Sequence, residues 1–267
     1  MQRIGNLITA AAVLSLATAC VAPARVAVRP EPRGVPGFDT RDYPGDAVMR
    51  GWFGDSPYRW VGYYLPAPCY TGTTWTGRRS SLRAMGWGFA VLYVGEQDWG
   101  AMGARTDTST APSPRCTSAH LTAEQGRAHG EEAAAAAAAD GFPGGTIIFL
   151  DVERVDRVSP ELATYVRGWT VRVLEDGRFE PGLYAHDVNV EALYPLLADE
   201  YARHQRSGRP ALWVARTTGF DLLASPRESG YAAAIWQGIL NTREEWNGGV
   251  LNIDVNVADS PDPSRGR

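Results

Sequence analysis

The stretch Thr146-Ile147-Ile148-Phe149-Leu150-Asp151-Val152-Glu153 decides the predicted fold. Its four consecutive apolar residues are typical of a parallel strand covered on both faces, whereas a one-sided strand alternates apolar and polar residues. The stretch ends in two acids. In a (β/α)8 barrel the carboxyl ends of the strands and the loops after them build the active site, so acids at this place indicate function.

Similar short runs, rich in apolar and aromatic residues, lie on both sides of this strand and alternate with helical or loop segments. The predicted strands are 35–40, 60–65, 88–95, 146–153, 182–186, 211–216, 232–237 and 251–257, and the clearest helices are 122–140, 160–176 and 189–206. The first of these helices begins with Thr122 and Gln125 in capping-box spacing and contains seven consecutive alanines at 133–139. Alternating strands and helices predict a parallel sheet, and eight such units predict a single (β/α)8 TIM barrel of the α/β class.

The length and composition of the chain are those of one globular domain, and they exclude several classes of enzyme and binding protein. A chain of 267 residues suits one such barrel, and a net charge of −4 argues against a nucleic-acid binder. All 26 basic residues are arginines, which excludes a Schiff-base lysine and a phosphate-binding Walker lysine. The four histidines are scattered, and neither G-x-S-x-G nor G-x-G-x-x-G occurs, so we expect no metal and no cofactor.

The amino terminus has the features of a targeting segment. Arg3 precedes the apolar stretch 4–19, and Ala17-Thr18-Ala19 forms a cleavage site, which predicts a signal peptide at 1–19. Cys20 follows, and Leu16 to Cys20 is similar to a bacterial lipobox, although the leucine stands four places before the cysteine rather than three. Cys20 is therefore either lipidated or the first residue of a secreted protein.

The domain organisation follows from this reading. Residues 20–34 are rich in proline, arginine and small residues and are predicted to form a lipidated or secreted tether. The barrel is expected at 35–260, and 261–267 is expected to be a disordered tail.

Two cysteines remain once Cys20 is set aside. Cys69 and Cys116 form an even pair in an oxidising compartment, where we expect a disulfide, with two unrelated buried thiols as the alternative. They follow the second and third predicted strands, so both belong to neighbouring loops of one rim. A bridge between them would hold the loop 96–121 beside the cleft.

Asp151 and Glu153 are the first candidates for catalysis. Side chains two apart on a strand project to the same face, which here is the barrel mouth. Glycoside cleavage uses one protonated and one ionised carboxyl group, and two acids close together separate their pKa values. Asp39 ends the first strand and Asp254 lies on the last, so barrel closure would bring both to the same cavity. The alternatives are ion pairs with arginines for the first two acids, and hydrogen bonds to loop backbone for the other two.

Candidate substrate-binding residues surround these acids. Tyr184, His186, Trp213 and Gln237 lie on or near strand ends, Asn256 accompanies Asp254, and Tyr64 and Trp99 lie on or after the second and third strands. Tyr70 and Trp75 lie in the loop after the second strand, where they could stack on sugar rings. For the loop aromatics the alternative is anchoring of the loop by partial burial, and for Trp213 it is packing in the core.

Several short motifs together resemble known families. Their order along the chain is similar to that of the family 25 glycoside hydrolases, the muramidase-type lysozymes: Gly37-Phe38-Asp39-Thr40, Phe149-Leu150-Asp151-Val152-Glu153, Gly182-Leu183-Tyr184, Leu212-Trp213-Val214-Ala215, Trp236-Gln237 and Ile253-Asp254-Val255-Asn256. The chain resembles more closely, from Gly37 to about Asp259, the mainly actinobacterial glycoside-hydrolase-like family catalogued as domain of unknown function 1906. That resemblance includes the segment 60–65 and Gly141-Phe142-Pro143.

The resemblance implies an exported barrel protein that acts on peptidoglycan or another cell-envelope polysaccharide. It makes Glu153 the general acid, while Asp151, Asp39 and Asp254 assist electrostatically or position water. We expect a glycan partner, contact with a membrane only through a lipid anchor, no nucleic acid, and a monomer. The alternative is a non-catalytic glycan-binding or wall-organising lipoprotein that has kept the acids, because fold alone does not establish function.

Overall fold

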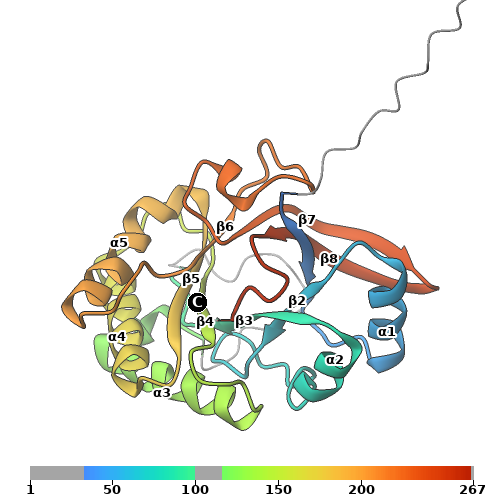
Figure 1. Cartoon of the computed structure of the whole chain (residues 1–267). Coiled ribbons are helices and arrows are strands. Elements are labelled where there is room, and N and C mark those ends of the chain that lie inside the picture. Colours follow the sequence, from blue (N-terminus) through green and yellow to red (C-terminus); the bar gives the residue numbers. More distant parts are fainter. Residues whose placement is uncertain (1–32, 100–115, 266–267) are drawn as a thin grey trace, which may run out of the picture. The chain divides into compact units, whose positions relative to one another are not determined.

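The computed structural model describes residues 33–99 and 116–265, which form a closed eight-stranded α/β barrel (Figure 1). The strands are β1 (Val35–Asp39), β2 (Trp60–Tyr64), β3 (Gly88–Val94), β4 (Ile147–Val152), β5 (Glu180–His186), β6 (Leu212–Ala215), β7 (Ile235–Trp246) and β8 (Gly249–Ala258). The described helices are α1 (Asp46–Asp55), α2 (Arg79–Met85), α3 (Ala123–Ala139), α4 (Pro160–Asp176) and α5 (Asp187–Arg203), with 3₁₀ turns at Ser118–His120 and Pro226–Ser229. The expected signal peptide, Cys20 and nearly all of the tether lie outside the described residues.

The predicted α/β barrel is confirmed, but its last strand runs in the opposite direction to the one expected. Strands β1 to β7 pair in parallel with their neighbours, whereas β8 is antiparallel to both β7 and β1. Asn247 and Gly248 join β7 to β8 with φ values of 51° and 73°. Such a two-residue connection gives an antiparallel hairpin, because a parallel connection needs a crossover of a dozen or more residues.

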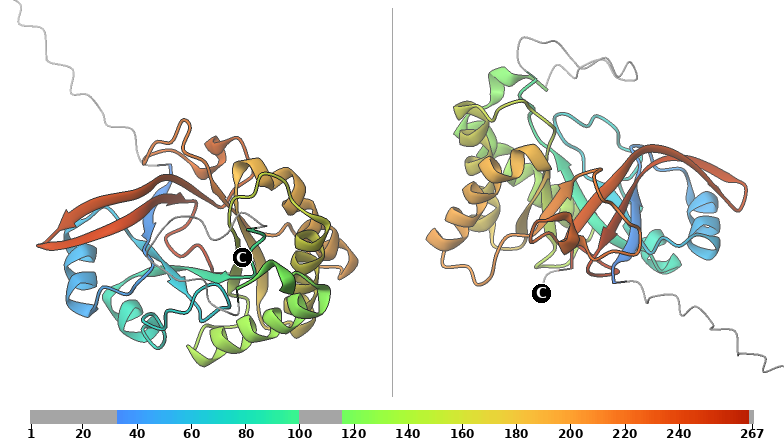
Figure 2. Two further views of the ribbon diagram at one scale, coloured as in Figure 1. Left: turned by 180° about the vertical axis from the view of Figure 1, so that it is seen from behind. Right: turned by 90° about the horizontal axis from the view of Figure 1, so that it is seen from above.

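The helices surround the barrel unevenly. In Figure 1, α3, α4 and α5 cover one side and α1 and α2 the other, and the β7–β8 hairpin extends past α1, as Figure 2 also shows. The Trp52 indole of α1 donates to Gly249 O at 2.9 Å and fixes this packing. Between β6 and β7, the described chain forms only a 3₁₀ turn where the repeating pattern predicts a helix.

The polyalanine helix α3 packs closely against α4. Thr122 caps it by accepting from the Gln125 amide at 3.1 Å, as the capping spacing predicts. A Cβ atom at Gly126 would lie 2.2 Å from Tyr165 O, and one at Gly168 would lie 2.3 Å from Ala123 O. Glycine is therefore needed at both places where the two helices touch.

Large side chains fill the barrel interior. Trp60, Phe149 and Trp213 are fully buried there, and the Trp213 ring meets the other two edge to face, with centroids 5.8 and 5.7 Å apart. The barrel is therefore a packed core with its chemistry at one end.

The segment after β8 binds the starts of two strands at the opposite end of the barrel. Ser264 O accepts from Ile147 N at 2.7 Å, and Ser264 N donates to Phe89 O at 2.8 Å, so this residue bridges the starts of β4 and β3. The predicted disorder is therefore wrong for residues 261–265. Within the described residues, no helix has both the length and the apolar character needed to cross a bilayer.

Candidate active site

Asp39 is the centre of a hydrogen-bond network at the carboxyl end of β1. Its Oδ1 accepts from the Tyr64 hydroxyl at 2.8 Å. Its Oδ2 accepts from Gln237 Nε2 at 3.0 Å and from Asn256 Nδ2 at 2.9 Å. These three donors come from β2, β7 and β8, so only the closed barrel brings them together.

Asp254 lies directly beside Asp39, because the two residues are register partners of the antiparallel β1–β8 pair. Its Oδ2 accepts from Gln237 Nε2 at 3.3 Å, and its Oδ1 accepts from the backbone amide of Asn241 at 2.6 Å. Asn241 has a φ of 52° at an irregularity in β7, a conformation that asparagine tolerates better than most residues. The bulge thus aims a backbone donor at the carboxylate.

Two further aromatic residues orient the amide groups. The Tyr184 hydroxyl donates to Gln237 Oε1 at 2.7 Å, and Trp213 Nε1 donates to Asn256 Oδ1 at 2.9 Å. Each amide oxygen is thereby occupied, and each amide nitrogen is left to face Asp39. Buried hydrogen bonds therefore hold the side chains that surround Asp39 in fixed orientations.

Asp151 and Glu153 approach this network from β4. Asp151 is 6% exposed, and its Oδ1 has no hydrogen-bond partner among the described residues. Strand β4 ends at Val152, one residue earlier than expected, so the partly exposed Glu153 lies just beyond it. The charges of Glu153, Asp39 and Asp254 all act on Asp151, so the four acids lie near one another.

Burial raises the pKa values of three of these acids, and for Asp151 and Asp254 the charges of the other acids raise the pKa further. For Asp151, burial comes first and the charge of Glu153 second, and together with the other acids they hold its pKa well above the ordinary value. Burial and the charge of Asp39 raise the pKa of Asp254 to about 7. Burial also raises the pKa of Asp39, although its three hydrogen bonds oppose this effect. The cluster can therefore hold protons at neutral pH, as acid–base chemistry requires.

The predicted substrate-binding residues separate into two groups. Tyr64, Tyr184, His186 and Trp99 are partly exposed, and His186 Nδ1 lies 2.7 Å from the Asp187 carboxylate. Gln237, Trp213 and Asn256 are buried, with at most 2% of their surface exposed. Gln237 and Asn256 in this second group bind Asp39, and Trp213 orients Asn256.

The aromatic residues in the loop after β2 anchor that loop. Tyr70 and Trp75 are buried, and both donate to Arg41 O, at 2.8 and 3.1 Å. The alternative of loop anchoring therefore holds for both.

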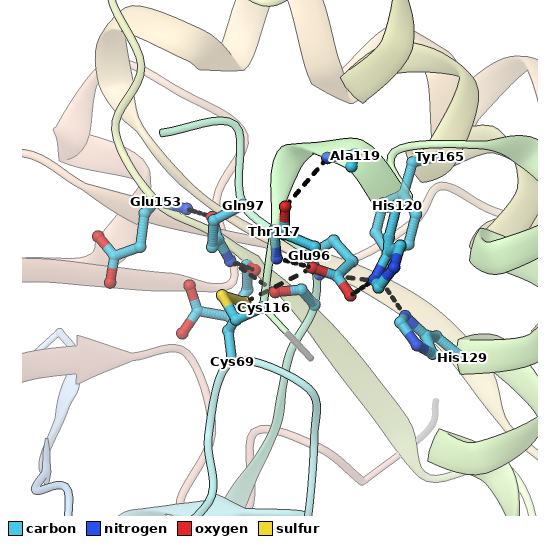
Figure 3. The surroundings of a disulfide bond; sticks show 12 residues. Cys69, Glu96, Gln97, Cys116, Thr117, Ala119, His120, His129, Glu153 and Tyr165 are labelled. Carbon is cyan, nitrogen blue, oxygen red and sulfur yellow. Dashed lines mark hydrogen bonds and ion pairs between the residues drawn. A yellow bond between two sulfur atoms is a disulfide. The ribbon is translucent and has the colours of Figure 1, made fainter. Parts of the chain in front are cut away.

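The expected disulfide joins Cys69 to Cys116, with the Cα atoms 4.8 Å apart (Figure 3). The buried carboxylate of Glu96 lies next to it, and in the described part of the chain these three side chains are the one group that could hold a metal. Both sulfurs are already bonded to each other, so the group offers no thiolate ligand in this state.

A wide hollow lies at the end of the barrel opposite the acids. That hollow is bordered by the starts of the strands and by the carboxyl-terminal segment, including Ile147, Glu180, Leu212 and Ser264. None of the candidate site residues lines it.

Two residues of the site were not predicted from the sequence. Gln97 binds the backbone around Asp151 and Glu153, and Asn241 supplies the amide that binds Asp254. Gln97 follows the carboxyl end of a predicted strand, which is where barrel enzymes place functional residues, so its position was a usable signal. Nothing in the sequence indicated the bulge at Asn241.

Comparisons with known proteins agree with the observed fold. The family model described as "Rv2525c-like, glycoside hydrolase-like domain" matches residues 51–258. Comparison with curated proteins gives no match.

Three solved structures share the fold at low sequence identity. The spore cortex lytic enzyme SleM of Clostridium perfringens has a TM-score of 0.53 and 14% identity, over 87% of this chain and 70% of that one. GHIP, a glycosyl hydrolase 25 of Streptococcus pneumoniae, has a TM-score of 0.51 and 13% identity, over 84% of this chain and 86% of that one. The Tat-secreted protein Rv2525c of Mycobacterium tuberculosis has a TM-score of 0.50 and 16% identity, over 85% of this chain and 95% of that one.

Proposed function

Since the chain belongs to the Rv2525c-like glycoside hydrolase-like family, we propose that it hydrolyses a glycosidic bond in peptidoglycan or another cell-envelope polysaccharide. The observation that carries the proposal is the gathering of four carboxyl groups at the carboxyl end of one closed barrel. Structural neighbours described as a spore cortex lytic enzyme and a glycosyl hydrolase 25 support the choice of substrate.

In this proposal each acid has a role that follows from its surroundings. Glu153 is partly exposed and can reach a substrate, so it acts as the general acid that protonates the leaving oxygen. Asp151, Asp39 and Asp254 assist electrostatically or position the attacking water, and those of them that are ionised stabilise the positive charge that develops on the sugar ring. The hydrogen bonds on Asp39 hold it in one orientation, which favours an electrostatic role for this residue.

The first test measures the release of reducing ends or muropeptides from wall preparations by the purified full chain and by its Glu153→Gln variant. We expect the substitution to lower kcat by about 100-fold or more, because it removes the proton donor and leaves the shape intact. Glu245→Gln, a substitution on the exposed hairpin, serves as the matched control and should retain full activity. Hydrolysis at the normal rate by folded Glu153→Gln would rule out the acid role.

A second candidate function is glycan binding without turnover. The saturation of Asp39 by three internal hydrogen bonds favours it, because a carboxylate bound in this way also serves as a structural anchor. This function predicts that glycan affinity, measured by calorimetry, is equal in the wild type and in Glu153→Gln while no products form. Absence of binding to every wall glycan would exclude it.

We also propose an extracytoplasmic location, in which the protein is either secreted or anchored through lipid on Cys20. The Cys69–Cys116 disulfide supports an oxidising compartment, and one structural neighbour is described as Tat-secreted. Fractionation of cells that express the wild type and Cys20→Ala tests the anchor. A lipoprotein leaves the membrane fraction on substitution, whereas a secreted protein has the same distribution in both forms.

A further inference from the structure

Gln97 binds the backbone of the two proposed catalytic acids at the end of β4, Asp151 and Glu153, on either side of Val152. Its Nε2 donates to Asp151 O at 2.9 Å and to Gly95 O at 3.1 Å, and its Oε1 accepts from Glu153 N at 2.9 Å. The side chain is 1% exposed, so these hydrogen bonds are shielded from water. The amide of Gln97 therefore encloses Val152 like a clamp.

This clamp lies at the end of β4, where the hydrogen bonds between β3 and β4 stop. The last register pair between β3 and β4 joins Val94 to Asp151, and β4 ends at Val152. Glu153 lies beyond the strand, where a hydrogen bond from its amide to a side chain replaces the ladder bond of a strand. The backbone position of Glu153 thus depends on the orientation of one amide group.

Glu96, the residue before Gln97, is itself fixed by several contacts. The carboxylate of Glu96 is fully buried and accepts from Thr117 N at 2.8 Å. Its Oε2 lies 4.0 Å from the sulfur of Cys69, and its backbone amide donates to the Tyr165 hydroxyl at 3.1 Å. Figure 3 shows the contacts of Glu96 beside the disulfide and those of Gln97 with Glu153; Glu96 and Gln97 are adjacent in the chain.

The disulfide determines whether these contacts stay together. Cys69 follows β2, and its amide donates to Val94 O at 3.3 Å, whereas Cys116 precedes the Thr117 amide that binds Glu96. The covalent bond between the two sulfurs therefore fixes the Thr117 donor over Glu96 at the end of β3.

We propose that Gln97 is a positioning residue that fixes Glu153 relative to Asp151, and that the Cys69–Cys116 disulfide holds Gln97 in place through Glu96. The proposal rests on the proposed hydrolysis for its kinetic consequence only. A general acid displaced by about 1 Å can lose 100-fold in rate. Since Gln97 is buried and binds backbone groups, its loss should lower kcat and leave KM nearly unchanged.

The kinetic test compares Gln97→Leu and Gln97→Glu with the wild type on the same wall substrate over a range of pH. Gln97→Leu should lower kcat by about 100-fold at every pH. A protonated carboxyl group has one donor and one acceptor, so Gln97→Glu can still bind Asp151 O and Glu153 N in acid, whereas its ionised form can only accept. We therefore expect this variant to retain activity at low pH and to lose it, relative to the wild type, as the pH rises.

The matched control is Gln205→Glu, an exposed residue outside the site, which should keep the pH profile of the wild type. The proposal is overturned if Gln97→Glu also keeps that profile, or if Gln97→Leu keeps the normal kcat. A rise in KM alone would equally overturn it.

A second measurement does not depend on activity. Amide hydrogen exchange of Glu153 should be at least about tenfold faster in Gln97→Leu, while the amides of Ile148 and Leu150 within β4 exchange as in the wild type. The Cys69→Ser/Cys116→Ser variant should also accelerate the exchange of Glu153, and unchanged exchange would refute the part assigned to the disulfide. If the wild type hydrolyses nothing, the proposed function fails, and exchange alone then decides whether the clamp exists.

Discussion

At the scale of single residues, the site combines rigid hydrogen bonding with acids that resist ionisation. Asp39 is bound on both oxygens, whereas Asp151 is buried with one oxygen unbound by the described residues. Asp254 has an intermediate environment, because it accepts two hydrogen bonds and yet has its pKa raised to about 7 by burial and by the charge of Asp39. The acids therefore respond differently to pH although they lie near one another.

The raised pKa of Asp254 has a consequence for stability. Its ordinary value is 3.8, so its contribution to folding stability is fully present below about pH 4 and is lost as the pH rises through 7. Part of the shift belongs to Asp39, so we expect this change to be on the order of 2 kcal/mol. Asp254→Asn should remove it, which urea denaturation between pH 4 and 8 would reveal. Asp55→Asn, at an exposed position at the end of α1, is the control. An unchanged pH dependence in Asp254→Asn would contradict the prediction.

At the scale of elements, loops at the carboxyl ends of β2 and β3 are tied together covalently. The disulfide spans 47 residues of sequence and connects the loop after β2 to the segment before α3. It stabilises the fold chiefly by restricting the unfolded chain, and it also keeps the rim of the site in place.

Removal of this disulfide should therefore be costly. For a loop of this length, chain entropy predicts a loss of about 4 kcal/mol in the free energy of unfolding for Cys69→Ser/Cys116→Ser. Denaturation under non-reducing conditions measures the loss. Cys20→Ala, which removes the remaining cysteine, should leave the stability unchanged, and a loss of less than about 1 kcal/mol in the double variant would show that strain or residual structure offsets the entropy.

At the scale of the whole barrel, closure depends on the last 20 or so described residues. Strand β8 fills the gap between β7 and β1 and delivers Asp254 and Asn256 to the site. The segment after it then inserts Ser264 between the starts of β3 and β4. One end of the barrel thus carries the chemistry while the other is held by the chain terminus.

Ser264 offers a test of this closure. Its Oγ accepts from the buried Val91 amide at 2.7 Å, so Ser264→Ala leaves that amide without a partner. We expect a loss of about 1–3 kcal/mol in stability, measured by thermal and urea denaturation, with little effect on the opposite end of the barrel. Ser81→Ala, which removes a hydroxyl bonded to Arg78 O on the surface of α2, should change stability much less. Equal effects of the two substitutions would contradict the role given to Ser264.

The sequence by itself determined the local elements and the chemistry available to them. Periodicity and capping placed α3, α4 and α5 within a few residues of their observed bounds, and the apolar run before Asp151 marked a buried parallel strand. The cysteine count predicted the disulfide that is observed. These features depend on neighbouring residues, or on the number of residues of one type, and both can be read directly from the chain.

Only the tertiary structure decided how these parts meet. Asp39 is bonded to partners 198 and 217 residues away, and Gln97 reaches Glu153 across 56 residues. It also decided the direction of β8, although Asn247-Gly248 is a hairpin signal that could have been read from the sequence. The physical reason is that these contacts form when the sheet closes on itself, and side-chain hydrogen bonds across a closed barrel have no period along the sequence.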